Sequence, residues 1–242
     1  MKSGSFIETN APSLFAAVAR LLRAVVLDRP GVRPALATLV EALPRLRPAT
    51  PWKLRDARAA QAEGLTDLAN TFDATGDSAL ASRAAALILG NEGLWPLDDV
   101  VVPVVLATCG SAGVPADAFV GPLLEACLRH LRARTAEAPT PPADAKRSTE
   151  GLTCACRDCT ALCTFVADPQ ARSWILKAIA LNRKHIESVI RAAGTDLDLV
   201  TVQKGSPHSL VCTKNQSRYE RRARQHRADL DIMARLESAR AG

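Results

Sequence analysis

The chain has 242 residues, of which 48% are hydrophobic and 4% aromatic, and its formal net charge at neutral pH is +6. This length corresponds to one large domain or two small ones, with enough apolar residues for a substantial core. Arg20 and Arg23 interrupt one apolar run near the N-terminus and the run 99–110 is short, so the sequence excludes a membrane-spanning segment.

The charge is unevenly distributed along the chain. Residues 1–150 contain 16 Lys and Arg and 16 Asp and Glu, whereas residues 151–242 contain 15 and 9, so the whole excess lies in the second part. A solvated basic surface explains this excess, and an anionic partner is the alternative. The N-terminus lacks a secretory pattern, so we expect an intracellular protein of the cytoplasm or nucleus, where cysteines stay reduced.

Residues 12–135 predict a series of helices separated by short turns that contain Pro, Gly or Asn. Asp77 is suited to cap one of these helices, and Gly90 is suited to end it. The expected helices cover 12–28, 32–46, 55–72, 77–91, 96–110 and 115–134. The predicted fold class is mainly α, with either a helical-hairpin, solenoid-like N-terminal part or a plain helical bundle.

A Pro-rich segment separates this part from the rest of the chain. Three prolines and small polar residues in 136–150 cannot bury a face, which is typical of a linker. We therefore predict a helical scaffold at 1–135, a linker at 136–150, and a cysteine-rich α+β module at 151–242.

The module begins with the cysteines and continues with a mixture of elements. Asp168 and Gly194 delimit a predicted helix, whose apolar stripe contains Trp174, Ile175, Ala178, Ile179, Ile186, Val189 and Ile190. Two runs with strand character, 197–203 and 209–213, flank a turn of Lys, Gly, Ser and Pro and predict a β-hairpin. Asn215 then caps a long Arg-rich C-terminal helix.

Four of the seven cysteines lie in the stretch T-C-A-C-R-D-C-T-A-L-C, residues 153–163. Cys154, Cys156 and Cys159 form a C-x-C-x-x-C pattern, and a tight turn can direct three such sulfurs toward one point. Thiolate and imidazole are preferred ligands of Zn²⁺, and a structural site closes with four of them. We therefore predict a zinc ion at this site. Because a closed site leaves no position for a reactive water, the ion would stabilise the fold of the module rather than take part in catalysis.

The spacing leaves the fourth ligand open. Cys163 lies one helical turn after Cys159 if a helix begins there, whereas His185 lies beside the apolar stripe of its own helix and can face the cluster. His208, in the hairpin turn, is a weaker candidate. The rival interpretation is a redox dithiol of Cys156 and Cys159, with Cys163 able to resolve a disulfide, although the usual βαβ surroundings are missing.

Residues 153–214 resemble the C-terminal segment of certain large, mostly fungal proteins with a prolyl-4-hydroxylase-like 2-oxoglutarate/iron oxygenase domain followed by a long helical stretch. The shared pattern is C-x-C-x-D-C, then Phe and Asp-Pro, an R-x-H-aliphatic helix, and G-S-P-x-x-L-V-x-T-K. It is carried here by Cys154, Cys156, Asp158, Cys159, Phe165, Asp168, Pro169, Arg183 or Lys184 with His185, Gly205, Ser206, Pro207, Leu210, Val211, Thr213 and Lys214.

This resemblance implies His185 rather than Cys163 as the fourth ligand, because the position of Cys163 is Asn-like in the shared pattern. The oxygenase activity does not carry over. An iron oxygenase needs a His-x-Asp/Glu pair and a distant His, and we expect none of the four histidines to have Asp or Glu two residues later. The chain would then be the helical and metal-binding tail of such a protein, or a relative of that tail.

The C-terminal helix offers a second surface for binding. Its cations are dense enough to contact phosphates, and they are Arg218, Arg221, Arg222, Arg224 and Arg227. Tyr219 is the only aromatic residue there, so base stacking has little support, and a solvated helix face is the alternative.

Together these features favour a non-catalytic zinc-binding interaction module on a helical scaffold, with a protein as its partner. A thiol redox protein that uses Cys156 and Cys159 is one alternative. A nucleic-acid-binding module that uses the Arg-rich helix is another. The sequence leaves the oligomeric state open.

Overall fold

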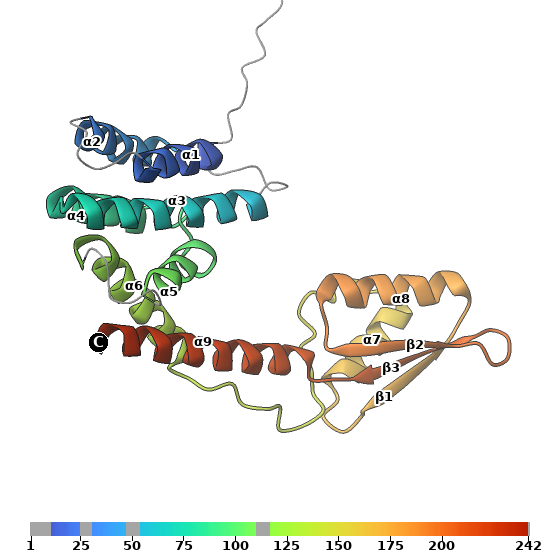
Figure 1. Ribbon diagram of the computed structural model, residues 1–242. Helices are drawn as coiled ribbons and strands as arrows, with labels where there is room; N and C mark the ends of the chain where they lie inside the picture. Colours follow the sequence, from blue (N-terminus) through green and yellow to red (C-terminus); the bar gives the residue numbers. More distant parts are fainter. Residues whose placement is uncertain (1–10, 25–30, 47–53, 110–116, 242) are drawn as a thin grey trace, which may run out of the picture. The chain divides into compact units, whose positions relative to one another are not determined.

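The computed structural model describes residues 11–24, 31–46, 54–109 and 117–241. These residues are mainly helical, with one small three-stranded antiparallel sheet and a long C-terminal helix, as predicted (Figure 1). The chain divides into two compact units, of which the first combines Met1–Ala136 with Ala228–Gly242 and the second is Glu137–Arg227. Within the described residues, no helix is long and apolar enough to cross a membrane.

The first unit is a stack of helical hairpins. Three pairs, α1–α2, α3–α4 and α5–α6, form successive layers (Figure 1). Their helices are α1 Ala11–Ala24, α2 Val32–Ala42, α3 Leu54–Thr75, α4 Ser78–Leu89, α5 Val102–Cys109 and α6 Asp117–Thr135. A short 3-10 turn, Leu43–Arg45, follows α2, and a π-helical turn, Leu97–Val101, precedes α5. The expected end of the first helix near residue 30 lies outside the described residues.

Local signals account for the start and end of α4. The Asp77 carboxylate accepts the backbone N–H of Leu80 at 3.1 Å, and Gly90 follows the last helical residue, as the sequence predicted. Aromatic contacts join the layers, since Phe15 on α1 meets Trp95 edge-on, with 5.3 Å between ring centroids. These side chains are buried in one continuous hydrophobic core.

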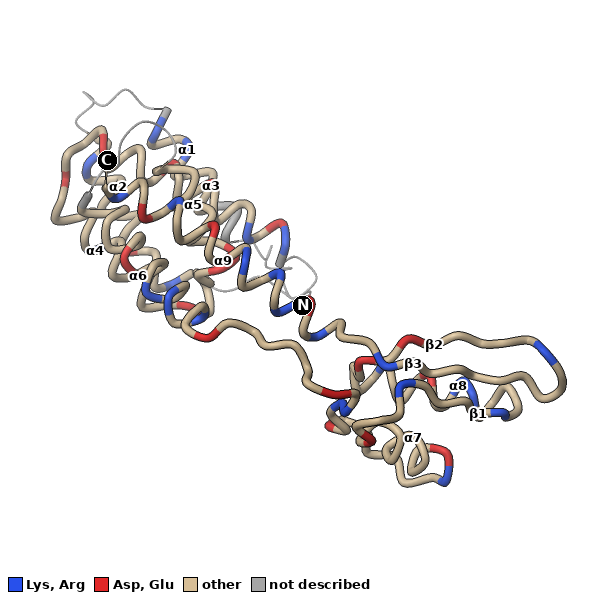
Figure 2. The backbone as a smooth tube through the Cα atoms, turned by 90° about the horizontal axis from the view of Figure 1, so that it is seen from below, with Lys and Arg blue, Asp and Glu red and all other residues tan. Residues whose placement is uncertain are grey.

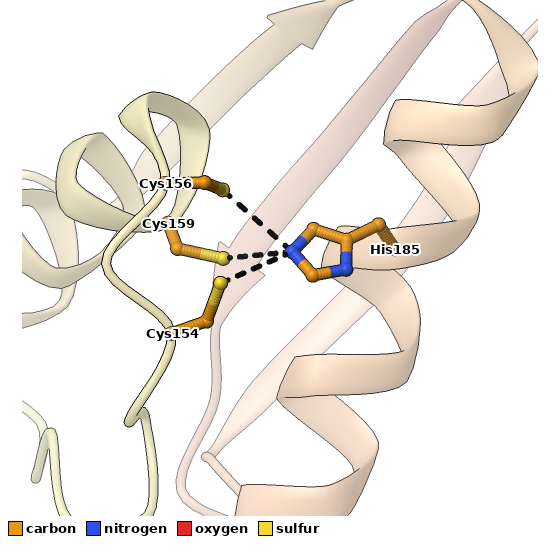
Figure 3. Close-up of side chains that lie close together, drawn as sticks. All are labelled: Cys154, Cys156, Cys159 and His185. Atoms are coloured by element: carbon orange, nitrogen blue, oxygen red, sulfur yellow. Dashed lines mark hydrogen bonds between the residues drawn. The ribbon is translucent and has the colours of Figure 1, made fainter.

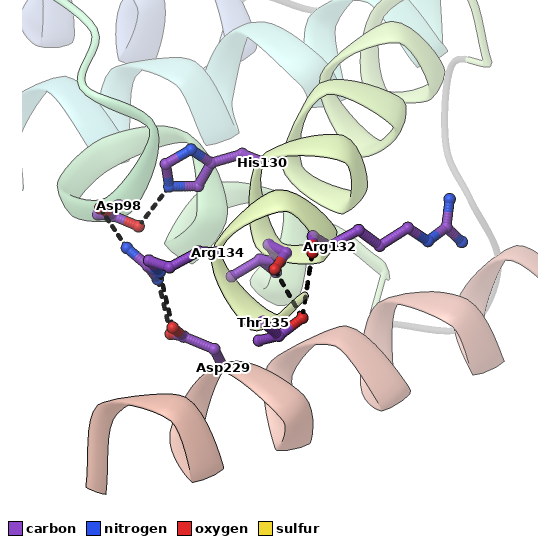
Figure 4. Close-up of polar contacts among 7 residues, drawn as sticks. Asp98, His130, Arg132, Arg134, Thr135 and Asp229 are labelled. Atoms are coloured by element: carbon purple, nitrogen blue, oxygen red, sulfur yellow. Dashed lines mark hydrogen bonds and ion pairs between the residues drawn. The ribbon is translucent and has the colours of Figure 1, made fainter. Parts of the chain in front are cut away.

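The C-terminal helix α9, Ser217–Ala241, contributes residues to both units. In the first unit, Arg134 on α6 donates two hydrogen bonds of 2.6 Å to the buried carboxylate of Asp229 on α9 (Figure 4). The same guanidinium contacts Asp98 at 2.7 Å, and His130 Nε2 lies 3.0 Å from Asp98. These contacts, with the buried side chain of Leu236, explain why the last residues belong to the first unit rather than to the predicted module of 151–242.

The second unit packs helices on one face of its sheet. Its elements are α7 Arg157–Ala167, β1 Ser173–Lys177, α8 Ala180–Ala193, β2 Leu197–Val202, β3 Ser209–Lys214 and the beginning of α9. The strand order is β1-β3-β2, and both pairings are antiparallel. Side chains from the inner face of the sheet form a core with α7 and α8, which contains Cys159, Leu162, Phe165, Val166, Leu176, Ile186, Ile190, Leu197, Leu210 and Cys212.

The predicted helix between Asp168 and Gly194 is wrong in its first part. Residues 173–177 form strand β1, and only Ala180–Ala193 are helical. The run Ser-Trp-Ile-Leu-Lys is rich in residues that favour strands, and β3 offers it a free edge for pairing. The tertiary partner therefore overrides the helical spacing of the apolar residues. Gly194 ends α8 in the left-handed conformation, with φ of 57°, as expected.

The predicted hairpin of β2 and β3 is present, with Val200 opposite Val211. The Asn215 side chain accepts the backbone N–H of Ser217 at the start of α9. The segment expected as a linker, 136–150, lies almost entirely within the second unit. Its backbone bonds to the end of α7, since the N–H of Arg147 donates to the carbonyl of Val166 at 2.9 Å.

Candidate metal centre

Three cysteines surround the N-terminal end of α7. Cys154 lies in the irregular segment before the helix, Cys156 is the residue that precedes its first turn, and Cys159 lies within that turn. The extended backbone at Cys156 and the following helical turn bring residues of spacing 2 and 3 to the same side. His185 comes from α8, which packs beside α7. Cys159 is 1% exposed and belongs to the core, whereas Cys156 and His185 are exposed.

The three sulfurs converge on a single nitrogen (Figure 3). His185 Nε2 lies 3.4 Å from Cys154 Sγ, 3.6 Å from Cys156 Sγ and 3.3 Å from Cys159 Sγ. All four atoms lie within 4.8 Å of one another. In the part of the chain that the structure describes, this is the one group of three or more His, Cys, Asp or Glu side chains placed to hold a metal ion.

The spacing of these atoms matches a tetrahedral site. With metal bonds of about 2.3 Å to sulfur and about 2.0 Å to nitrogen, tetrahedral angles separate sulfur from nitrogen by about 3.5 Å. The observed distances of 3.3 to 3.6 Å are close to this value. Hydrogen bonds alone do not explain them, because one imidazole nitrogen offers a single proton or lone pair and cannot satisfy three thiols at once.

The cluster also favours a cation electrostatically. Hydrogen bonds from the backbone N–H and then the thiol of Cys159 lower the pKa of the Cys156 thiol to about 7. Burial, followed by the Cys156 and Cys154 sulfurs, raises the pKa of the Cys159 thiol to about 12. The Cys156 thiol ionises readily, whereas the Cys159 thiol holds its proton because it is buried beside other sulfurs. A divalent cation at their common centre supplies the charge that allows all three to ionise.

Cys163 and His208, the other candidates for the fourth ligand, lie apart from this group. Cys163 is half-buried, and its sulfur lies 4.0 Å from the carbonyl oxygen of Leu152. His208 is half-buried, with its Nδ1 atom enclosed, at the start of β3. The structure thus brings together Cys154, Cys156, Cys159 and His185, the set implied by the resemblance.

A His-x-Glu sequence does occur in the chain, at His185-Ile186-Glu187, contrary to our expectation. It lies inside α8, where residues two apart point to different sides of the helix, so the imidazole and the carboxylate cannot chelate one metal ion together. Glu187 instead faces Arg191, one turn further along, at 3.6 Å.

The five arginines predicted to contact anions serve different purposes. Arg218 donates to the carbonyls of Ala193 and Gly194 and so completes the C-terminal end of α8. Arg224 lies 3.9 Å from Glu220, and Arg227 donates to the carbonyl of Ala223. Arg221 and Arg222 are exposed. The helix therefore uses Arg218 for its own fold.

Comparisons with protein-family models, with curated proteins and with solved structures give no match to this chain. The site therefore has to be interpreted from its own geometry.

Sequence reasoning missed the polar bridge beside the centre. Asn182 at the start of α8 donates to the carboxylate of Asp158 in the first turn of α7, at 3.3 Å. This bond joins the two helices that carry the four candidate ligands. The signal was present in the sequence, because Asp158 belongs to the C-x-C-x-D-C pattern and Asn182 precedes His185 by three residues.

Proposed function

We propose that the second unit is a non-catalytic, zinc-stabilised interaction module. One observation carries this proposal, namely the convergence of three sulfurs on His185 Nε2 at distances suited to a tetrahedral ion. Three thiolates and one imidazole form a donor set that Zn²⁺ prefers. With four protein ligands the coordination is complete, so the ion holds the fold and activates no water.

The placement of the centre supports a structural role. The four residues belong to the N-terminal end of α7 and to α8, so an ion would cross-link the only two helices that cover the inner face of the sheet within the second unit's described residues. Cys159 is itself part of that core. The core of the second unit is small beside that of the first, and a metal ion supplies stability that so few apolar contacts cannot.

Metal analysis of purified protein tests the proposal. We expect one zinc ion per chain in the wild type and in Cys163→Ser, and loss of zinc in Cys159→Ser and His185→Ala. Cys163→Ser is a matched control because Cys163 lies on α7, one turn after Cys159, but outside the cluster. A wild-type protein without metal, or a Cys163→Ser variant that loses it, would overturn the proposal.

Hydrogen exchange after chelation tests the structural role separately. Removal of the ion should expose the amides of α7, α8 and the sheet to exchange, because these elements share the centre and its core. The amides of α3 and α4 belong to the first unit and should keep their protection. Unchanged protection in the second unit after complete zinc loss would contradict a structural function.

A thiol redox protein is the second candidate, and one observation favours it. Cys156 is exposed at the N-terminal end of α7 with Cys159 three residues later, the placement of an attacking thiol and its partner. The two thiols would pass two electrons and two protons to a disulfide substrate, forming one disulfide and releasing two thiols. Metal-free protein that cycles between these forms at the potential of a thiol buffer would establish this function.

Under the zinc proposal, the first unit acts as the scaffold and the second as the surface for a protein partner. The four residues that converge are also those of the pattern shared with the tails of oxygenase-associated proteins. We propose on this basis that the second unit is a relative of those tails, and that it binds rather than oxidises.

A further inference from the structure

The sheet of the second unit has an outer face that α7 and α8 do not cover. Side chains alternate between the two faces of a strand, and Leu176, Leu210 and Leu197 point to the core. The residues between them therefore point outward. On the three strands these are Ser173, Ile175 and Lys177 of β1, Ser209, Val211 and Thr213 of β3, and Asp198, Val200 and Val202 of β2.

The centre of this outer face is apolar. The register places Ile175 opposite Val211, and Val211 opposite Val200, so three aliphatic side chains form a row across all three strands. Ile175 is 62% exposed and Val200 is 59% exposed. Val202 stands beside this row, and Ile179 and Leu181 follow directly after β1.

This concentration of exposed apolar residues is unusual for the protein. Of the seven large hydrophobic residues that are exposed in the described part of the chain, five lie between Ile175 and Val202. The others, Leu21 and Leu230, are single residues on helices. Three of these five, Ile175, Val200 and Val202, share the outer face of the sheet, and exposed apolar side chains gathered on one face indicate a surface that another molecule covers.

Positive charge lies beyond both ends of the strands. Lys177 and Lys204 are at the end that carries Val202, since Lys177 and Val202 both pair with Ser209 and Lys204 follows Val202 by two residues, and Arg172 precedes β1 at the other end. The only acidic side chain among the outward positions is Asp198, which accepts a hydrogen bond from Asn215 at 2.8 Å. The second unit as a whole carries 15 Lys and Arg against 9 Asp and Glu (Figure 2). A partner therefore needs an apolar stripe with acidic residues beside it.

The dimensions of the face select the shape of that partner. Three strands about 4.8 Å apart, each contributing five residues at about 3.3 Å, span roughly 240 Å². A stable dimer buries about 800 Å² per partner, so this face alone is too small to hold a second copy of the chain. None of the nine outward residues is aromatic, which leaves no platform for stacking bases. An α-helix of about four turns, roughly 21 Å long and 10 Å wide, has a similar area.

We propose that the outer face of the sheet binds an acidic amphipathic helix of a partner protein. Its leucines at positions i, i+3, i+4 and i+7 cover the row of Ile175, Val211 and Val200, and its flanking carboxylates meet Lys177 and Lys204. The helix supplies the layer that the sheet lacks on this side. This inference rests on the proposed interaction function and adds the surface and the class of partner.

A designed peptide tests the proposal with the zinc-loaded protein. The probe is a labelled helical 14-residue peptide with four leucines at those positions and Glu on both flanks, measured by fluorescence anisotropy. We expect a Kd on the order of 100 µM, since the contact is small. Replacing the Glu residues with Lys should weaken binding at least about tenfold, because like charges then meet at Lys177 and Lys204.

Two protein variants locate the binding surface. Ile175→Thr combined with Val200→Thr keeps residues that favour strands but buries two hydroxyls under the helix, so we expect at least about a tenfold loss of affinity. Leu21→Gln is the matched control, because it removes an exposed aliphatic side chain from the first unit, and its affinity should equal that of the wild type.

Zinc content, measured on the same samples, separates this proposal from the previous one. Zinc-loaded protein that ignores the acidic peptide up to about 1 mM overturns the proposed face and leaves the metal proposal intact. Equal binding by the double variant, a dimer that the double variant disperses, or binding of phosphatidylserine vesicles in place of the peptide also overturns it. Wild-type protein that is purified without metal and still binds the peptide refutes the zinc proposal alone.

Discussion

Replacing Arg134 with Met should destabilise the first unit strongly, because it removes the guanidinium that faces the buried carboxylate of Asp229. The Asp229 side chain is 1% exposed, and two nitrogens of Arg134 lie 2.6 Å from its oxygens. Removing one partner of a buried pair costs about 3–5 kcal/mol, since the other charge stays out of water. Arg134 is itself 32% exposed, so we place the cost at the lower end, about 3 kcal/mol.

The neighbouring pair of Arg132 and Glu237 provides the control. It joins the same two helices at 2.7 Å, but its side chains are 47% and 41% exposed. Water screens such a pair, and Arg132→Met should cost less than about 1 kcal/mol. The two variants remove the same chemical group from the same helix, but only Arg134 faces a buried carboxylate, and it also contacts the exposed Asp98.

Native-state hydrogen exchange in urea measures both effects on the first unit alone. The slowest amides of α4 and α6 report the free energy of its unfolding, whatever happens in the second unit. A difference of about 2 kcal/mol between the variants is the expected result. Equal losses would refute the argument that burial decides the strength of these pairs, and a negligible loss in Arg134→Met would show that α9 needs no charge pair to dock.

Two further predictions concern the first unit. Gly64→Ala should destabilise the first unit by about 1–3 kcal/mol in urea unfolding, although Ala has the better helix propensity, because a Cβ at Gly64 would lie 2.5 Å from the ring of Phe15. The control is Gly121→Ala, where a Cβ would have no neighbour within 4 Å, and it should be neutral or stabilising. Burial raises the pKa of Asp98, but the bonds from Arg134 and His130 outweigh it and hold that pKa below the ordinary value of 3.8. The stability that Asp98 contributes is therefore present above about pH 4 and is lost as the pH falls through its folded pKa. Asp98→Asn should flatten the decline in hydrogen-exchange protection of the α6 amides between about pH 5 and about pH 3. An unchanged decline would contradict this.

The helices and the hairpin could be predicted because their signals are local. Asp77 caps α4 three residues from the amide that it binds, and the turn between β2 and β3 separates two short apolar runs. Strand β1 could not be predicted in this way, because its pairing with β3 joins residues far apart in the sequence, such as Ile175 and Val211. The spacing of apolar residues in 168–194 carries no information about the unpaired edge of β3, which a later segment of the chain forms.

The two units begin and end where contacts between distant residues place their boundaries. A Pro-rich composition indicated a boundary near residue 150, but hydrogen bonds from Arg147 attach that segment to the second unit. At the other end, the pairing of Arg134 with Asp229 spans 95 residues and draws the end of α9 into the first unit. Long-range polar contacts of this kind leave no trace in local composition.

Most of the candidate site followed from spacing, and geometry explains the rest. Cys159 and Cys163 share one face of α7, but four helical residues separate them by about 6 Å along the axis. Two side chains four residues apart on a helix can still bind one metal ion, so spacing leaves Cys163 possible, and only the structure shows its sulfur outside the group. The position of His185 is set by the packing of α8 against α7, which no local spacing encodes, and His185 meets the sulfurs from there.

The metal centre and the outer face of the sheet are consequences of one constraint. A small three-stranded sheet gains stability when helices cover both faces, but the second unit packs its helices on one face and exposes Ile175 and Val200 on the other. A face kept free for a partner cannot also contribute to the core, so the stability must come from elsewhere. Under the proposed function, zinc at the junction of α7 and α8 would supply it without covering the sheet. Filling the outer face with a bound helix should therefore make the second unit less dependent on its metal.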